Sequence, residues 1–277
     1  MSLETCTILA FCISLLIQVG YPLSIALYFR RRTAAPWQAF LYGTLIFAVF
    51  QLFTWLPLRV YLDTLMTARL RDSSDVFLWM LALALSTALV EEAGRLVGFR
   101  FLFSRGGLRL NWRNGVMYGL GHGTLETVLL IAGLTFVHLL AYLTLHRGDW
   151  ALLVQSLGAD GNTALGDALY AILDTTWDQP LIVALERVLA LPHQVAWSLM
   201  VMSSLIARQK RWFFFAMLYH ASIALIVPGL VRLVGFGLAE AANVLFALIS
   251  LWIIIKLRSL LPQAPPVAQL RGKQIAE

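Results

Sequence analysis

The chain has 277 residues, of which 60% are hydrophobic and 13% are charged, and its formal net charge is +6. A soluble domain carries about 25% charged residues, so this composition excludes a soluble globular protein and is typical of a polytopic membrane protein. The cations lie in short segments between apolar runs, so they indicate membrane topology, and no nucleic-acid partner is expected.

Seven apolar runs are long enough to cross a bilayer, which takes about 20 residues. They cover residues 5–29, 38–62, 76–103, 114–145, 180–207, 212–230 and 238–257. The predicted fold class is therefore all-α, a polytopic membrane helix bundle of about seven transmembrane helices. Residues 1–261 are expected to form a single bundle, and the proline-containing segment 262–277 is predicted to be a disordered cytoplasmic tail.

The charges of the connecting segments predict the orientation. Segments 30–36, 104–113 and 208–211 are strongly basic, whereas 63–75 and 146–178 are mixed or acidic. By the positive-inside rule the N-terminus lies outside and the C-terminus is cytoplasmic, and we expect a bacterial inner (plasma) membrane protein. The long connection 146–178 is predicted to be an outer interfacial loop with one or two helices, which covers the bundle as a lid or takes part in substrate entry.

Ionisable side chains interrupt the third and fourth apolar runs. Arg95 follows Glu91 by four residues and Glu92 by three, so it can pair with either carboxylate and leaves the other in surplus. His122 and Glu126 are four residues apart on the next run, so Glu126 can orient the imidazole. Buried polar groups are costly without partners, so ionisable residues inside a membrane indicate a functional site.

Two later runs carry further histidines. Glu186 and His193 are seven residues apart on the fifth run, and His220 lies in the sixth. At about 1.5 Å per residue, the three histidines fall in one layer with Glu92, on the cytoplasmic side of the midplane. We therefore expect His122, His193 and His220 to belong to one site.

Glycines repeat every four residues on the two runs that carry the carboxylates and the first histidine: Gly94 and Gly98, then Gly115, Gly119 and Gly123. Such faces let two membrane helices approach closely. We therefore predict that the two glycine faces pack together and bring the turn of Glu91 and Glu92 to the turn of His122.

Carboxylates and histidines in a buried pocket are suited to activating water. Glu91 or Glu92 would take a proton from water, and the histidines would bind a metal or hydrogen-bond the developing oxyanion. If a metal is bound, His122, His193 and His220 are its expected ligands. Zinc and the absence of any cofactor are equally compatible with the pattern, because no HExxH motif is present.

Four short motifs occur in order along the chain: Glu91-Glu92-x-x-Arg95, Gly121-His122-Gly123-x-x-Glu126, Glu186-Arg187 followed by His193, and His220-Ala221. In this order they resemble the motifs of the YhfC-type membrane peptidases. That family is grouped distantly with the type II CAAX prenyl endopeptidases and bacteriocin-processing (CPBP) proteases and with the Aph subunit of gamma-secretase. The resemblance implies a glutamate-dependent intramembrane protease. In the CAAX branch a polar residue follows the last histidine by four positions, where this chain has Ala224, with Ser222 nearby.

The predicted function is an intramembrane endopeptidase, glutamic-type or metal-dependent, with Arg95, Glu126 and Glu186 as supporting residues. Its expected partners are membrane lipid and a peptide or membrane-protein substrate. Intramembrane Glu, His and Arg also build relays, so a proton- or metal-coupled transporter is one alternative, although no inverted repeat is evident. A catalytically inactive, Aph-like scaffold is the other.

Overall fold

A computed structural model describes residues 2–67, 69–70, 72–148 and 163–263, and every regular element within these ranges is helical. Seven helices in this part of the chain are long and apolar enough to cross a membrane: Leu3–Thr33, Trp37–Met66, Ser73–Arg105, Trp112–His146, Asp178–Ile206, Arg211–Val234 and Phe236–Leu260. The prediction of an all-α protein with seven membrane spans is confirmed. The orientation of the termini stays a prediction.

The chain divides into two compact units, one of Met1–Tyr21 with Thr127–Val188, the other of Pro22–Glu126 with Leu189–Glu277. The described part of the first unit contains the beginning of α1 (Leu3–Thr33), most of η3 (Glu126–Ile131), α7 (Ala132–Arg147), α9 (Thr163–Leu173) and the beginning of α10 (Asp178–Ile206). The predicted single bundle and disordered tail stay predictions, and most of the tail lies outside the described residues.

Apolar packing and a buried hydrogen bond hold the first unit together. Phe11 of α1 packs against Leu139 and Tyr142 of α7. Ser14 Oγ donates a hydrogen bond to the carbonyl of Pro180 at 2.6 Å. Helix α9 is the described helical part of the predicted interfacial loop, whereas residues 149–162 of that loop lie outside the described residues.

The second unit contains the elements that build the polar site: the rest of α1, α2 (Trp37–Ile46), η1 (Phe47–Trp55), α3 (Leu56–Thr67), α4 (Ser73–Val97), η2 (Gly98–Leu102), α5 (Phe103–Arg105), α6 (Trp112–Leu125), the later part of α10, α11 (Arg211–Val234) and α12 (Phe236–Leu260). The η elements are π-helical segments inside longer spans. Side-chain caps fix where two of these helices begin. Asp72 accepts two backbone N–H bonds at the start of α4, and Asn111 accepts one at the start of α6.

Two glycines bring the backbones of α2 and α6 into direct contact. A Cβ atom added at Gly43 would overlap the carbonyl oxygen of Tyr118, and one added at Gly121 would overlap the carbonyl oxygen of Phe40. Each helix therefore has one glycine that lies directly against the backbone of the other helix. This close approach sets the position of His122, the next residue after Gly121.

The predicted partnership between the glycine faces is wrong. Gly115, Gly119 and Gly123 face α10, whose Met202, Val195 and Leu191 are nearest to the three positions. Gly94 faces Phe50 of η1, and Gly98 faces Ile46 of α2 and the ring of Tyr118. The four-residue spacing identifies a face of small residues, but the neighbour that packs on it depends on how each helix is rotated in the bundle.

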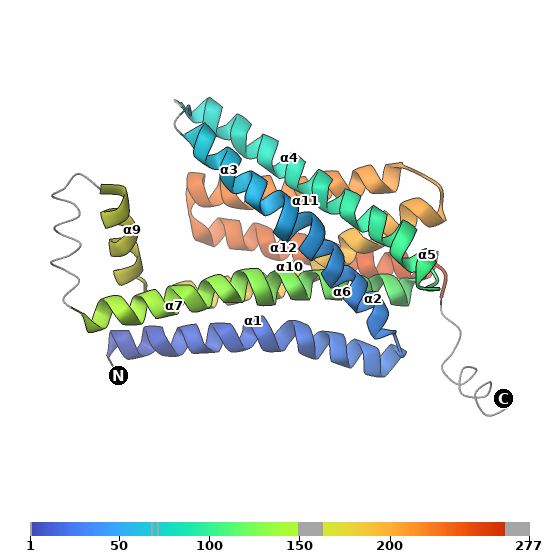
Figure 1. The fold of residues 1–277 in the computed structure, drawn as a ribbon, viewed down its shortest axis with the longest axis horizontal. Coiled ribbons are helices and arrows are strands. Elements are labelled where there is room, and N and C mark those ends of the chain that lie inside the picture. Colours follow the sequence, from blue (N-terminus) through green and yellow to red (C-terminus); the bar gives the residue numbers. More distant parts are fainter. Residues whose placement is uncertain (1, 68, 71, 149–162, 264–277) are drawn as a thin grey trace. The chain divides into compact units, whose positions relative to one another are not determined.

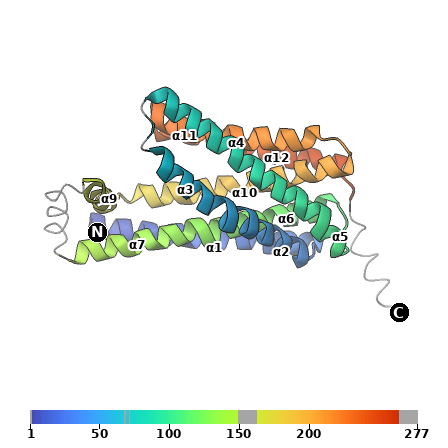
Figure 2. The same cartoon turned by 45° about the horizontal axis from the view of Figure 1, so that its top comes forward.

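Helices α4 and α11 run antiparallel and side by side (Figures 1 and 2). His220 contacts Glu92, and Arg232 contacts Met80. Glu92 and Met80 are twelve residues apart on α4, and His220 and Arg232 are twelve residues apart on α11. Twelve residues correspond to about 18 Å along each helix. The pair therefore keeps one register from the buried polar residues to the end where α4 begins and α11 ends.

Candidate active site

Arg95 of α4 binds both neighbouring carboxylates. Its Nη1 donates to Glu92 Oε1 at 2.6 Å, and its Nη2 donates to Glu91 Oε2 at 3.1 Å. All three side chains are buried. The pairing expected from the spacing is therefore present, and the guanidinium binds both acids instead of one.

Two histidines from other helices reach the same carboxylates. His122 Nε2 of α6 lies 3.3 Å from Glu91 Oε2, and His220 Nδ1 of α11 lies 2.9 Å from Glu92 Oε1. An ionised carboxylate only accepts hydrogen bonds, so the imidazole nitrogen that faces it carries the proton. The structure thus brings together four of the five predicted catalytic residues.

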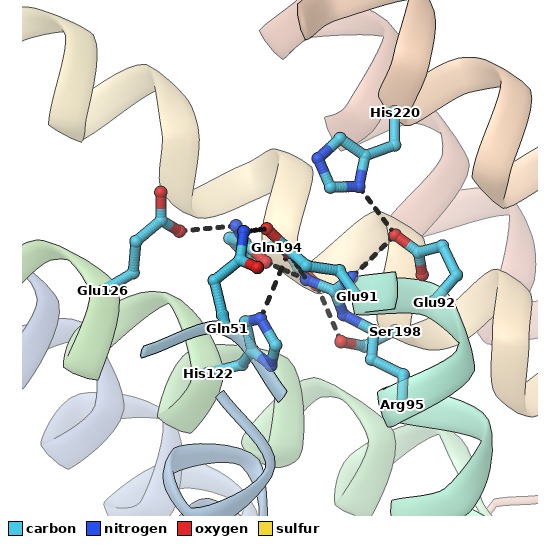
Figure 3. Close-up of polar contacts among 9 residues, drawn as sticks. All are labelled: Gln51, Glu91, Glu92, Arg95, His122, Glu126, Gln194, Ser198 and His220. Carbon is cyan, nitrogen blue, oxygen red and sulfur yellow. Dashed lines mark hydrogen bonds and ion pairs between the residues drawn. The ribbon is translucent and has the colours of Figure 1, made fainter. Parts of the chain in front are cut away.

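Two amides that the sequence analysis missed complete the network. Gln51 of η1 donates from Nε2 to Glu91 Oε1 at 2.6 Å. Gln194 of α10 accepts from Arg95 Nη2 through its Oε1 and donates from Nε2 to Glu126 Oε2 at 2.5 Å. Figure 3 shows Gln194 between Glu126 on one side and the Arg95 ion pairs on the other. Both glutamines could have been found in the sequence as polar amides inside apolar spans, because a buried amide, like a buried charge, needs hydrogen-bond partners.

His193 joins a second polar group, on α12. Its Nδ1 lies 2.8 Å from Ser250 Oγ, and its Nε2 lies 3.5 Å from Asn243 Oδ1. Tyr219 OH lies 2.9 Å from the same Ser250 hydroxyl. These two hydrogen bonds of His193 thus link α10 to α12, whereas those of His122 and His220 go to Glu91 and Glu92.

The ring of Trp197, also missed from sequence, lies between the two polar groups. It stacks on His220 with a centroid separation of 3.8 Å and an interplanar angle of 9°. The His193 ring lies 5.8 Å from it on the same helix, and Arg95 Cζ lies 5.6 Å from its centroid. His193 is thus connected to His220 through an aromatic ring.

The remaining predicted residues lie in different settings. Glu126 begins η3 (Glu126–Ile131) and reaches the network through Gln194. Glu186 belongs to the first compact unit, and its supporting role stays a prediction. The Ser222 hydroxyl donates to the carbonyl of Leu218 in its own helix at 2.7 Å.

The two acids differ in how many of their oxygens are engaged. Glu91 accepts hydrogen bonds at both oxygens. Glu92 accepts its bonds at Oε1, whereas its Oε2 is buried and has no hydrogen-bond partner among the described residues. His122 Nδ1 is likewise buried and unpartnered within that part of the chain. Such orphaned polar atoms are where buried water is expected.

The fold and this network define an all-helical integral membrane protein with a buried cluster of carboxylates, histidines, amides and one arginine. The chain belongs to the YhfC intramembrane metalloprotease family, whose model matches residues 13–244. It is 27% identical over 202 residues to the uncharacterized membrane protein YhfC of Bacillus subtilis (strain 168), a match that covers 72% of this chain and 76% of that relative. No solved structure matches. The YhfC-type resemblance is confirmed, and the distant grouping with CAAX prenyl endopeptidases and Aph stays a prediction.

The cluster in this arrangement does not fit the metal that the family description implies. A catalytic zinc site uses three protein ligands, and among the described residues no three His, Cys, Asp or Glu side chains converge as ligands. The Arg95 guanidinium bonds both carboxylates, so a cation already occupies the position between them. His122, His193 and His220, the ligands predicted for a bound metal, are not brought together.

We expect wild-type protein and His122→Ala to contain equal, near-zero zinc after purification without chelator. The physical reason is that Arg95 already neutralises the carboxylates that a metal would need. Inductively coupled plasma mass spectrometry measures the content, with His146→Ala as a control at a histidine that bonds the Tyr142 carbonyl instead. Stoichiometric zinc in the wild type that disappears only in His122→Ala would contradict this expectation.

Proposed function

We propose that the chain is an intramembrane endopeptidase in which Glu92 activates the hydrolytic water. The observation that carries this proposal is the asymmetry of the Glu92 carboxylate. Oε1 is held by Arg95 and His220, and Oε2 is buried without a partner among the described residues. A carboxylate fixed at one oxygen and unengaged at the other is suited to accept a proton from water. Glu91, engaged at both oxygens, is better suited to positioning His122.

In the proposed reaction Glu92 Oε2 accepts a proton as the water oxygen attacks the carbonyl carbon of the scissile peptide bond. The proton then passes to the leaving nitrogen as the C–N bond breaks, which releases a carboxylic acid and an amine and returns Glu92 to its ionised form. His122 and His220 serve as proton or oxyanion partners. His193 acts as a positioning residue through Trp197, and Arg95, Gln194 and Glu126 hold the network together.

The test is cleavage of a library of membrane-segment peptides by protein reconstituted in liposomes, with new termini identified by mass spectrometry. Glu92→Gln keeps the size and the acceptor at Oε1 but cannot take a proton, so the cleavage rate should fall by about 100-fold or more. A Glu92→Gln protein that cleaves as fast as the wild type would contradict the proposal.

Glu240→Gln is the matched control for this experiment. It makes the same chemical change in another membrane span, on α12, at a carboxylate that takes no part in the Arg95 network. We expect its cleavage rate to equal that of the wild type. A similar loss in both variants would indicate a general effect of removing a carboxylate from the membrane.

A catalytically inactive scaffold is the second candidate, because the same network connects α4, α6, α10 and α11 through buried hydrogen bonds. A scaffold would show no cleavage of the library by the wild type. It would also lose stability in Glu92→Gln, since the His220 and Arg95 bonds to Oε1 weaken when their acceptor loses its charge.

A further inference from the structure

A groove of about 730 Å³ lies between the start of α4 and the end of α11, away from the polar cluster. Its walls are mainly apolar side chains: Val76, Phe77 and Met80 from α4, with Leu225, Leu230 and Leu233 from α11. Phe77 is 54% exposed and Leu233 is 83% exposed. Because both helices are membrane spans, an apolar groove open to the surroundings faces lipid chains.

Two opposite charges line this groove, with Asp72 farther out along α4 than Met80, which Arg232 contacts. Asp72 is the residue that caps α4, and Arg232 lies in the last turn of α11. Both therefore stand where membrane spans end, at the level of lipid headgroups. Asp72 Oδ1 accepts the backbone N–H groups of Ser74 and Asp75, and no ion pair joins the two described residues Asp72 and Arg232.

Arg232 has an unusually weak partner for a guanidinium. Its Nη1 contacts Met80 Sδ at 3.6 Å, and a thioether is only a weak hydrogen-bond acceptor. Guanidinium groups bind phosphate oxygens far more strongly, often through two parallel hydrogen bonds. The groove thus presents a cation suited to phosphate, a carboxylate suited to an ammonium group and apolar walls next to both.

The apolar walls have the depth of a lipid chain. Along α4 the lining residues extend from Ser73 to Met80, and along α11 from Leu233 to Leu225. At 1.5 Å per residue these stretches are about 10 and 12 Å long, and the contact between Arg232 and Met80 places the α11 stretch deeper than the α4 stretch. One leaflet contributes about 15 Å of hydrocarbon, so the groove accommodates most of an acyl chain.

We propose that this groove is a binding site for a zwitterionic phospholipid with a primary ammonium group, of the phosphatidylethanolamine type. The lipid phosphate binds Arg232, its ammonium binds the Asp72 carboxylate, and an acyl chain lies between α4 and α11. Phosphatidylglycerol has no ammonium for Asp72 and carries a net negative charge toward it. The quaternary ammonium of phosphatidylcholine cannot donate a hydrogen bond to the carboxylate.

Native mass spectrometry of delipidated protein, titrated separately with the three lipids, tests the headgroup assignment. The wild type should bind phosphatidylethanolamine most tightly, and Arg232→Gln should weaken that binding about tenfold through loss of a charge-assisted bond. Asp72→Asn retains a good helix cap and should remove the preference over phosphatidylglycerol. Arg59→Gln, at an exposed pair with Asp63, should bind as the wild type does. Equal affinity for all three lipids in the wild type would overturn the proposal.

Gly229 allows the chain-binding part to be tested separately. It lines the groove, and a Cβ atom added there meets nothing within 4 Å, so Gly229→Phe fills the groove without a clash at Cβ. Gly133→Phe on α7 is the matched control, because Gly133 is equally open. We expect loss of bound phosphatidylethanolamine only in Gly229→Phe, and glycerophosphoethanolamine, which lacks acyl chains, should not compete.

Three outcomes would contradict the proposed lipid site. Wild-type lipid binding in both Gly229→Phe and Arg232→Gln would show that the groove holds no lipid. A change of oligomeric state in Gly229→Phe without a change in bound lipid would assign the groove to a second copy of the chain. Full competition by glycerophosphoethanolamine or inorganic phosphate would show that only the headgroup is bound and that the groove holds no acyl chain.

Discussion

Replacing Arg95 with methionine is expected to lower the free energy of unfolding by about 3 to 5 kcal/mol. The substitution removes the shared cation of two buried carboxylates, and breaking a buried ion pair from one side leaves uncompensated charge. It also removes the donor to Gln194. Titration with sodium dodecyl sulfate in mixed micelles, followed by far-UV circular dichroism, measures the change.

Two comparisons show whether charge is the cause. Arg59→Met breaks an exposed pair with Asp63, whose atoms lie 3.6 Å apart, and should cost at most about 1 kcal/mol. Adding Glu91→Gln and Glu92→Gln to Arg95→Met should restore most of the lost stability, because neutral buried groups need no counter-charge. A triple variant as unstable as Arg95→Met alone would mean that packing of the arginine, and not its charge, is what matters.

A single added methyl group at Gly121 is expected to be almost as damaging, with Gly121→Ala costing about 3 kcal/mol or more. The new Cβ would overlap the carbonyl oxygen of Phe40, and a backbone atom cannot rotate away as a side chain can. Overpacking usually costs about 1 to 3 kcal/mol, and here α2 and α6 must separate. The same surfactant titration measures the effect.

Glycines without neighbours provide the control for that substitution. Gly20→Ala and Gly133→Ala add the same carbon to a helix where nothing lies within 4 Å. Alanine favours a helix over glycine by up to about 1 kcal/mol, so these variants should be as stable as the wild type or more stable. Equal behaviour of Gly121→Ala and the two controls would refute the close contact between α2 and α6.

The parts of the structure that follow from local spacing were predictable from sequence. Seven apolar runs gave seven spans because length and hydropathy are properties of each run alone. The contact of Arg95 with an acid on its own helix follows from three- and four-residue spacing, although one of the two acids was expected to be in surplus and both are bound. His122 and His220 join them because buried ionisable groups need partners, and the cluster supplies the opposite charge.

Contacts that depend on how helices rotate against one another were not predictable. Gln194 directly follows His193, yet the two side chains serve different polar groups, since one residue turns an α-helix by about 100°. Trp197 has no polar signature in a chain rich in aromatic residues. The glycine faces were recognised, but their partners α10, η1 and α2 could not be derived from a repeat on one helix.

The nine π-helical residues of η1 give the second span a sensitivity to single-residue deletion. A π-helix closes its backbone hydrogen bonds five residues apart instead of four. Removing one residue there, such as the exposed Val49, would let the span return to α-helical geometry and change the directions in which the side chains of this segment point. Gln51 would then point away from Glu91 although the span keeps its hydropathy and almost its full length. A family member with a one-residue alignment gap within this segment is therefore expected to lack the amide contact to the carboxylate that corresponds to Glu91.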